Sequence, residues 1–268
     1  MFAGTLYLAL GAHFWRSRWS KRHAAPVSHG VARLEKCAIG LALLAHATGL
    51  QLALFGEEIM HFSFSLAFCL MIWLATLIYW LESFQVRLDG VQPIILFSAA
   101  VAAFLPLLFP QSHPIAHTEA LGFRLHFFAI MLAAGLFALA AAHALFMGAV
   151  EKRLHQPQHS RLVDSMPPLL ALESLLFRIL NIAFVLLTLA IGSGLFYSEV
   201  MFQRMLTFEH KTVFGILSWV IFAILLAGRH IYGWRGRRAR RWTLAGFVAL
   251  LLAYVGSYFV LEVLLGRV

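Results

Sequence analysis

Residues 209–241, EHKTVFGILSWVIFAILLAGRHIYGWRGRRARR, contain the pattern that decides the fold. His210 and Lys211 open an apolar run, and His230 closes it just before a dense cluster of arginines. Along a helix, His210 and His230 are roughly 30 Å apart, the thickness of the hydrocarbon core of a bilayer. This stretch therefore predicts a membrane-spanning helix with a histidine at each end.

The composition of the whole chain is typical of a multi-pass membrane protein. Of its 268 residues, 61% are hydrophobic and only 12% are charged, and the mean hydropathy is +0.82. The net charge of +9 comes from basic residues between apolar runs. That placement indicates topology and contact with membrane lipid, and argues against nucleic acid as a partner. Cys37 and Cys69 form no CxxC or CxxCH motif, so they predict neither a disulfide nor covalently attached haem.

Eight apolar segments are close to the length that a helix needs to cross a bilayer, although the first is short. Open strands leave backbone groups unpaired in lipid, so we expect an all-α integral membrane protein, a single polytopic domain over residues 1–268. The expected helices cover residues 2–15, 37–55, 64–81, 91–109, 122–150, 177–197, 211–228 and 242–265. Just before the sixth, residues 169–176 fit either an amphipathic segment on the membrane surface or a plain linker.

The charges between these segments predict the orientation of the chain. The connections after the first, fifth and seventh segments are strongly basic, whereas those on the opposite side are acidic or nearly neutral. Lys and Arg close to span ends are retained in the cytoplasm. We therefore expect eight spans with both termini on the outer side.

Four of the thirteen histidines lie in or at the ends of the expected spans. His126 and His210 begin spans at the outer face, His46 lies inside the second span, and His230 ends the seventh at the cytoplasmic face. Ionisable residues in spans predict function, although an imidazole at the interface also has a plain structural explanation. On a helical wheel His210 and His230 point to nearly opposite sides, so we expect them to serve different pockets.

Two histidines on different helices at one depth can ligate a single metal, which makes His126 and His210 the predicted pair. No cluster of Asp, Glu or Cys lies nearby in the sequence, so haem iron fits better than a closed zinc site. The neighbouring aromatic residues suit a porphyrin face, or form an interfacial belt. These residues are Phe123, Phe127, Phe128, Phe208, Phe214 and Trp219. A second pair, His113 and His117, is a weaker metal candidate, because Pro114 argues against a continuous helix there.

Four segments of the sequence resemble one known family. They are HKTVFGILSWVIFAILLAGRHIYGWRGRRARRWTLAGFVALLLAYVGSYF (210–259), MPPLLALESLLFRILNIAFVLLTLAIGSGLFY (166–197), LHFFAIMLAAGLFALAAAHALF (125–146) and LALLAHATGL (41–50). Together they are similar to the cytochrome c assembly membrane proteins, the CcsA/CcmC superfamily, and most of all to its YpjD/HemX-like branch. The similarity covers most of the chain, and the combination of HKT with GWRGRR is its most specific part.

The resemblance implies haem b handling at the outer face of a bacterial inner (plasma) membrane, with other assembly proteins as partners. His126 matches the first outer histidine of the family, and His210 lies where the family's tryptophan-rich loop enters the next helix. His230 and His46 lie near its two transmembrane histidines. The chain departs from the family pattern in two ways: SEVMFQRMLTFEH contains no tryptophan, and no histidine follows His230.

We therefore predict a haem-binding protein of cytochrome c assembly or haem handling, with no catalytic turnover of its own. Small residues on the fifth segment, Ala129, Ala133 and Ala134, would allow close packing beside the cofactor. The alternative is a cofactor-free scaffold or regulator that binds partners through residues 151–176 and 235–241. A small-molecule transporter is the least supported class, because few polar residues lie in mid-span.

Overall fold

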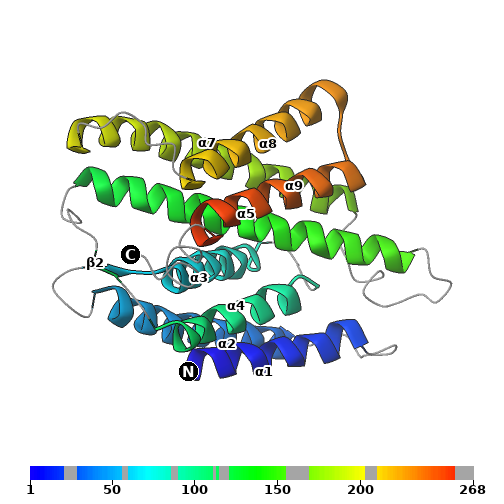
Figure 1. Cartoon of the computed structure of the whole chain (residues 1–268). Coiled ribbons are helices and arrows are strands. Elements are labelled where there is room, and N and C mark those ends of the chain that lie inside the picture. Colours follow the sequence, from blue (N-terminus) through cyan, green and yellow to red (C-terminus); the bar gives the residue numbers. More distant parts are fainter. Residues whose placement is uncertain are drawn as a thin grey trace.

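The computed structural model describes residues 1–20, 29–55, 60–85, 90–110, 113–114, 121–154, 169–202 and 210–256. Within these ranges the chain forms a bundle of long helices (Figure 1). The helices are α1 (Phe2–Phe14), α2 (His29–Phe55), α3 (Phe64–Glu82), α4 (Gln92–Leu108), α5 (Leu121–Leu154), α7 (Leu169–Phe202), α8 (His210–Tyr232) and α9 (Gly236–Leu251). Two π-helical turns, η1 (Trp15–Ser20) and η2 (Leu252–Gly256), extend α1 and α9.

Among the described helices, five are long and apolar enough to cross a membrane: α2, α3, α5, α7 and α8. Helix α4 is a shorter apolar helix, and Pro106 lies in its last turn. The prediction of an all-α membrane protein is confirmed. Each predicted apolar segment overlaps one described helix.

Helix α7 differs from the expectation at its start. Residues 169–176 form neither a separate surface segment nor a linker, because they are the first turns of one continuous helix. Leu172 and Leu176 are fully buried in the main core, and Glu173 is bonded to Arg229 of α8. The apolar face of this segment thus packs against protein, and its carboxylate has an arginine partner inside the bundle.

A short strand pair was not expected from the sequence. β1 (His61–Phe62) and β2 (His113–Pro114) pair antiparallel, with His61 opposite Pro114 and Phe62 opposite His113. The pair joins the α2–α3 connection to the α4–α5 connection. It supports the prediction that Pro114 prevents a helix there, whereas His117 lies outside the described residues.

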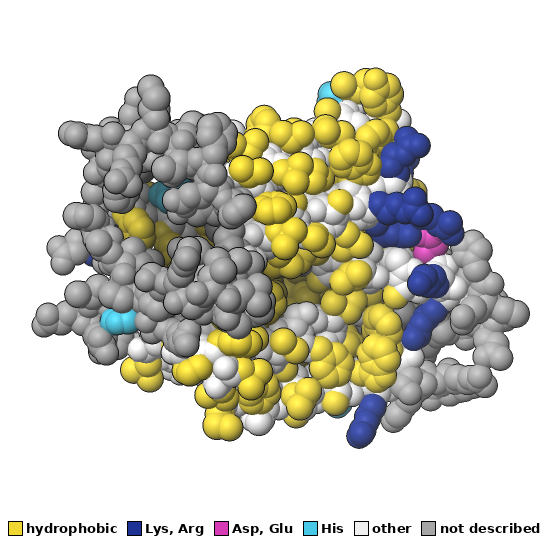
Figure 2. Space-filling model, in the orientation of Figure 1, with side chains coloured by type: hydrophobic (Ala, Val, Ile, Leu, Met, Phe, Trp, Pro, Cys, Tyr) yellow, Lys and Arg dark blue, Asp and Glu magenta, His cyan; other side chains and the backbone are white. Residues whose placement is uncertain are grey.

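Successive helices run in alternating directions. In Figure 1, α1, α3, α5 and α8 run from left to right, and α2, α4, α7 and α9 run back. Figure 2 shows a broad hydrophobic band across this face of the molecule, with Lys and Arg side chains gathered along one edge of it. A charge-free belt bordered by cations at one edge is what a bilayer with a basic cytoplasmic face requires.

Helix α5 is the centre of the bundle and packs against α3, α7 and α9. Its alanines let neighbouring backbones approach closely, and Ala133 and Ala134 are buried. The tightest point is Gly135, where an added Cβ would lie 2.8 Å from the Leu74 Cβ and 3.3 Å from the Met71 carbonyl oxygen. The backbones of α3 and α5 therefore meet at a position that only glycine fits.

The connection between α8 and α9 is a tight turn built by GWRG (residues 233–236). Gly233 has a φ of 64°, and its N–H donates to the Arg229 carbonyl at 3.1 Å, which ends α8 in a left-handed cap. The Trp234 ring folds back over Gly228, where an added Cβ would lie 2.5 Å from it. Glu173 of α7 accepts from the Arg229 guanidinium at 2.7 Å and from the Gly236 N–H at 3.3 Å. This carboxylate attaches the turn to the bundle.

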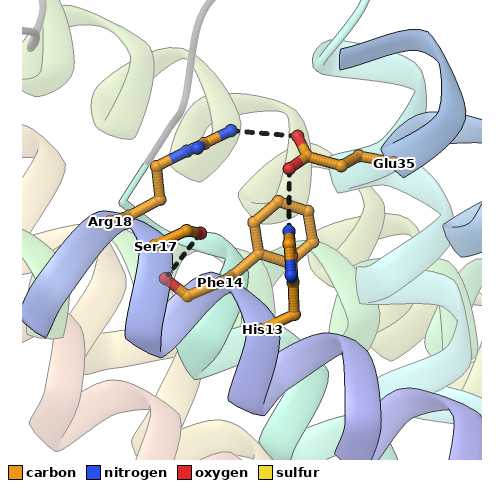
Figure 3. A network of polar contacts seen from close by, with 5 residues as sticks. All are labelled: His13, Phe14, Ser17, Arg18 and Glu35. Carbon is orange, nitrogen blue, oxygen red and sulfur yellow. Dashed lines mark hydrogen bonds and ion pairs between the residues drawn. The ribbon is translucent and has the colours of Figure 1, made fainter. Parts of the chain in front are cut away.

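A similar carboxylate joins α1 to α2 at the same end of the bundle. Glu35 accepts from Arg18 at 2.9 Å and contacts His13 Nε2 at 3.0 Å (Figure 3). The Glu35 and Arg18 side chains are both only 12% exposed, so this pair is more shielded from solvent than an ordinary surface salt bridge. His13 of α1 therefore has a specific partner in this network.

We predict that Gly135→Leu lowers the thermal stability of the protein in mild detergent. The leucine side chain meets the α3 backbone, which cannot move aside cheaply, and overpacking of this kind costs about 1–3 kcal/mol. Gly49→Leu is the matched control, because an added Cβ at Gly49 meets nothing within 4 Å. Equal melting temperatures for the two variants would contradict the close approach of α3 and α5.

Candidate functional site

His126 lies in the second turn of α5, at the end of the bundle opposite the arginine-rich edge. Its imidazole is half-buried, and its Nδ1 lies 2.9 Å from the Ser193 hydroxyl oxygen of α7. The ring also lies close to Gly194, where an added Cβ would be 3.0 Å from the His126 Cε1. Helix α7 therefore holds the imidazole through one hydrogen bond and one glycine.

The hydrogen bonds of Ser193 favour one tautomer of His126. Ser193 donates its hydroxyl proton to the Ala190 carbonyl at 3.1 Å, so its oxygen accepts from the Nδ1–H of His126. In the neutral imidazole the lone pair is then on Nε2. Metal-binding histidines are commonly oriented in this way, with the second ring nitrogen donating to a fixed partner. The geometry thus prepares His126 to bind a metal through Nε2.

Two of the aromatic residues selected from the sequence, Phe123 and Phe127, lie on the same turns of α5 as His126. Phe123 and Phe127 are nearly parallel with ring centroids 6.0 Å apart, and Phe62 meets Phe127 edge-on at 5.4 Å. Phe128 is exposed on the surface of α5. Phe62 and Phe127 belong to an apolar cluster that includes Met131. An apolar aromatic surface on the same turns of α5 as a histidine suits the face of a porphyrin, so these residue types fit haem.

The proposed partner ligand, His210, is the first residue of α8, but its side chain lies outside the described residues, as does Phe208. Helices α5 and α8 run in the same direction (Figure 1), so His126, in the second turn of α5, and His210, the first residue of α8, lie near the starts of two parallel helices. Their pairing on one iron therefore stays a prediction. Trp219 lies further along α8 toward its C-terminal end, where its ring stacks on the Phe184 ring of α7 with centroids 5.5 Å apart.

His46 has a different environment. It is 4% exposed, and its Nε2 lies 2.9 Å from the Cys69 sulfur of α3. The Tyr7 ring of α1 meets the imidazole edge-on at 5.6 Å. Within the described part of the chain, neither the Tyr7 hydroxyl nor the His46 Nδ1 has a hydrogen-bond partner, and each such buried group costs about 1–3 kcal/mol. His46 remains a predicted cofactor ligand, but its packing against Tyr7 and Cys69 separates it from His126.

Two further histidines, His230 and His143, are also not part of the His126 site. His230 is exposed in the last turn of α8, next to the arginine-rich turn and at the opposite end from His210. His143, which the sequence analysis does not select, is fully buried on α5, and its Nδ1 contacts the Leu139 carbonyl at 2.9 Å. Its mid-span position is the sequence signal that identifies it as unusual. Cys69 carries no such signal, because its partner is 23 residues away.

The fold and the histidines together define an all-α, multi-pass membrane protein with a metal-competent imidazole at one end. Residues 40–265 match the family Cytochrome C assembly protein, and the chain belongs to this family. The predicted resemblance is thus confirmed.

Two kinds of relative illustrate the similarity. The Inner membrane protein YpjD of Escherichia coli (strain K12) is 34% identical over 172 residues, which are 63% of this chain and 62% of that protein. The Cytochrome c biogenesis protein CcsA of Prochlorococcus marinus (strain MIT 9303) is 31% identical over 85 residues, 32% of this chain and 27% of that protein. The chain therefore spans about 62% of the length of the YpjD relative and a smaller share of CcsA. The prediction of a multi-pass protein of the bacterial inner membrane is confirmed.

We predict that the two cysteines react very differently with a maleimide in mild detergent. Cys37 is exposed, whereas Cys69 is buried beside His46. In single-cysteine variants, Cys69 should label more than about tenfold more slowly than Cys37, because thiol reactivity depends on access and on thiolate formation. Equal labelling rates in Cys37→Ser and Cys69→Ser would show that the His46 cluster is open, contrary to the packing described above.

Proposed function

We propose that this protein binds haem at the outer end of α5 and acts as a haem carrier or chaperone in cytochrome c biogenesis, without turnover of its own. The observation that carries the proposal is the half-buried imidazole of His126, whose Nδ1 is held by Ser193 so that Nε2 carries the lone pair. Membership of the Cytochrome C assembly protein family and the CcsA relative support the role in cytochrome c biogenesis.

The proposed orientation has eight spans and both termini on the outer, periplasmic side. It is supported by the alternating directions of the helices and by the Lys and Arg side chains along one edge of the apolar belt (Figure 2). In this orientation α1, α4 and α9 complete the set of spans, and the first turns of α5 and α8 lie at the outer face. Haem delivered to a periplasmic partner would be handled on that side.

Each neighbouring side chain has a defined role in the proposed site. Haem b would be held at its iron by His126 and His210, the proposed ligands. Ser193 bonds the His126 Nδ1 and so orients the imidazole ring. Phe123 and Phe127, on the same turns of α5 as His126, provide an apolar surface for the porphyrin. Gly194 leaves room for the ring, since any larger residue there would meet it.

We predict that His126→Ala and His210→Ala each reduce the Soret band of the protein purified in mild detergent, and that the double variant abolishes it. His230→Ala should leave the band intact, because His230 is exposed at the other end of α8. Ser193→Ala should weaken haem affinity by about 10–100-fold, the usual effect of losing a residue that orients a metal ligand. An unchanged spectrum in the double variant would overturn the ligand assignment.

The scaffold alternative is less well supported by the described contacts. Glu151 of α5 pairs with Arg237 at 2.7 Å and also with Arg240, and Arg238 lies over the Trp234 ring at 5.2 Å. Part of the basic segment therefore packs α9 against its neighbours within the protein, and these side chains are not free to bind a partner. Reversing the charge of Arg237 or of Arg238 would test the scaffold. Arg238→Glu is the better variant, because Arg237→Glu also breaks the ion pair with Glu151. Loss of cytochrome assembly in Arg238→Glu with an unchanged haem spectrum would favour the scaffold.

A further inference from the structure

A groove lies between α5 and α9 at the arginine-rich edge of the bundle. Its volume is about 890 Å³, within the range of roughly 300–1,000 Å³ that is usual for ligand sites. Leu145 and Gly148 of α5 and Leu244 of α9 form its apolar part. Leu145 is half exposed on the outside of the bundle, so the apolar part faces the lipid.

The polarity of the groove changes in one direction along both of its walls. On α5 the lining passes from Leu145 and Gly148 to Lys152, and on α9 it passes from Leu244 to Arg241 and Arg237. These helices run in opposite directions (Figure 1), so both walls become cationic toward the same, arginine-rich edge. From Arg237 to Leu244 the helix rises about 10 Å, which is comparable to the depth of a lipid headgroup region.

The charges of the groove do not cancel. Four of its lining residues are Lys or Arg and one is acidic, namely Glu151, which pairs with Arg237 and Arg240. Lys152 and Arg241 are exposed and add positive charge at the same mouth. A basic pocket between helices on the cytoplasmic side of a membrane is a suitable site for an anionic lipid headgroup.

We propose that this groove binds an anionic phospholipid, with its phosphate at Lys152 and Arg241 and its acyl chains along Leu145, Gly148 and Leu244. A soluble anion would use the cationic mouth but has no part that fits the apolar wall. A zwitterionic lipid would fit the wall but carries no net charge to match the mouth. Only an anionic amphiphile satisfies both ends of the groove.

Native mass spectrometry of the full-length protein in mild detergent tests the proposal. The probes are phosphatidylglycerol and phosphatidylcholine with the same acyl chains. Lys152→Gln/Arg241→Gln should lower the phosphatidylglycerol affinity by roughly thirtyfold, as expected for two cations near a membrane surface. Arg237 and Arg240 are left in place because each pairs with Glu151. The matched control, Arg16→Gln/Arg238→Gln, removes two exposed arginines that do not line the groove and should bind like the unmodified protein.

A second variant tests the apolar wall without changing any charge. Gly148→Phe should fill the groove and lower phosphatidylglycerol binding, whereas Gly49→Phe, at an exposed position with open space around it, should not. Equal binding of the two lipids, equal losses in the two double variants, or displacement of the lipid by millimolar inorganic phosphate would each overturn the proposal. Undiminished binding by a folded Gly148→Phe would overturn it as well.

Discussion

The ion pair between Glu173 and Arg229 determines much of this structure. A carboxylate buried near the end of a membrane helix is costly unless it is paired and hydrogen-bonded. Glu173 meets that requirement with the Arg229 guanidinium at 2.7 Å and with the backbone N–H of Gly236 at 3.3 Å. The pair fixes α7 against the turn between α8 and α9. Because α7 is one continuous helix, it also sets the depth of Ser193, which lies about 30 Å further along the axis.

The same principle recurs along the arginine-rich edge. Glu35 joins α1 to α2 through Arg18, and Glu151 joins α5 to α9 through Arg237 and Arg240. The basic residues that determine the orientation of a membrane protein thus also contribute to its packing here. At the opposite end of the bundle, Ser193 of α7 bonds His126. The Glu173–Arg229 ion pair that fixes α7 at one face therefore also supports the position of the imidazole at the other face.

The sequence predicts the apolar helices well, because their length and composition are set by the bilayer itself. It does not predict the contacts between them. Arg229 and Glu173 are 56 residues apart, and His46 and Cys69 are 23 apart, so no local pattern connects either pair. The interpretation of residues 169–176 as a surface segment or linker was wrong, because they begin the continuous helix α7 and Leu172 and Leu176 face protein. The hydrogen bond between His126 and Ser193 depends on which side of α5 faces α7. The burial of His143 likewise depends on which side of α5 faces the neighbouring helices.

The family comparison and the geometry support haem handling in different ways. The family match covers residues 40–265, and the family's tryptophan-rich loop has no counterpart in residues 198–210. The proposed haem binding therefore rests on His126, whose side chain the structure describes, and not on a tryptophan-rich loop. The anionic-lipid groove lies at the opposite face and is independent of this site.

Near-infrared magnetic circular dichroism of the haem-loaded protein tests the proposed ligation most directly, because this spectrum distinguishes the axial ligands of low-spin ferric haem. Ligation by His126 and His210 predicts the spectrum of two imidazoles, lost in the His126→Ala variant. A histidine–methionine or thiolate spectrum, or a failure to take up haem at all, would contradict it.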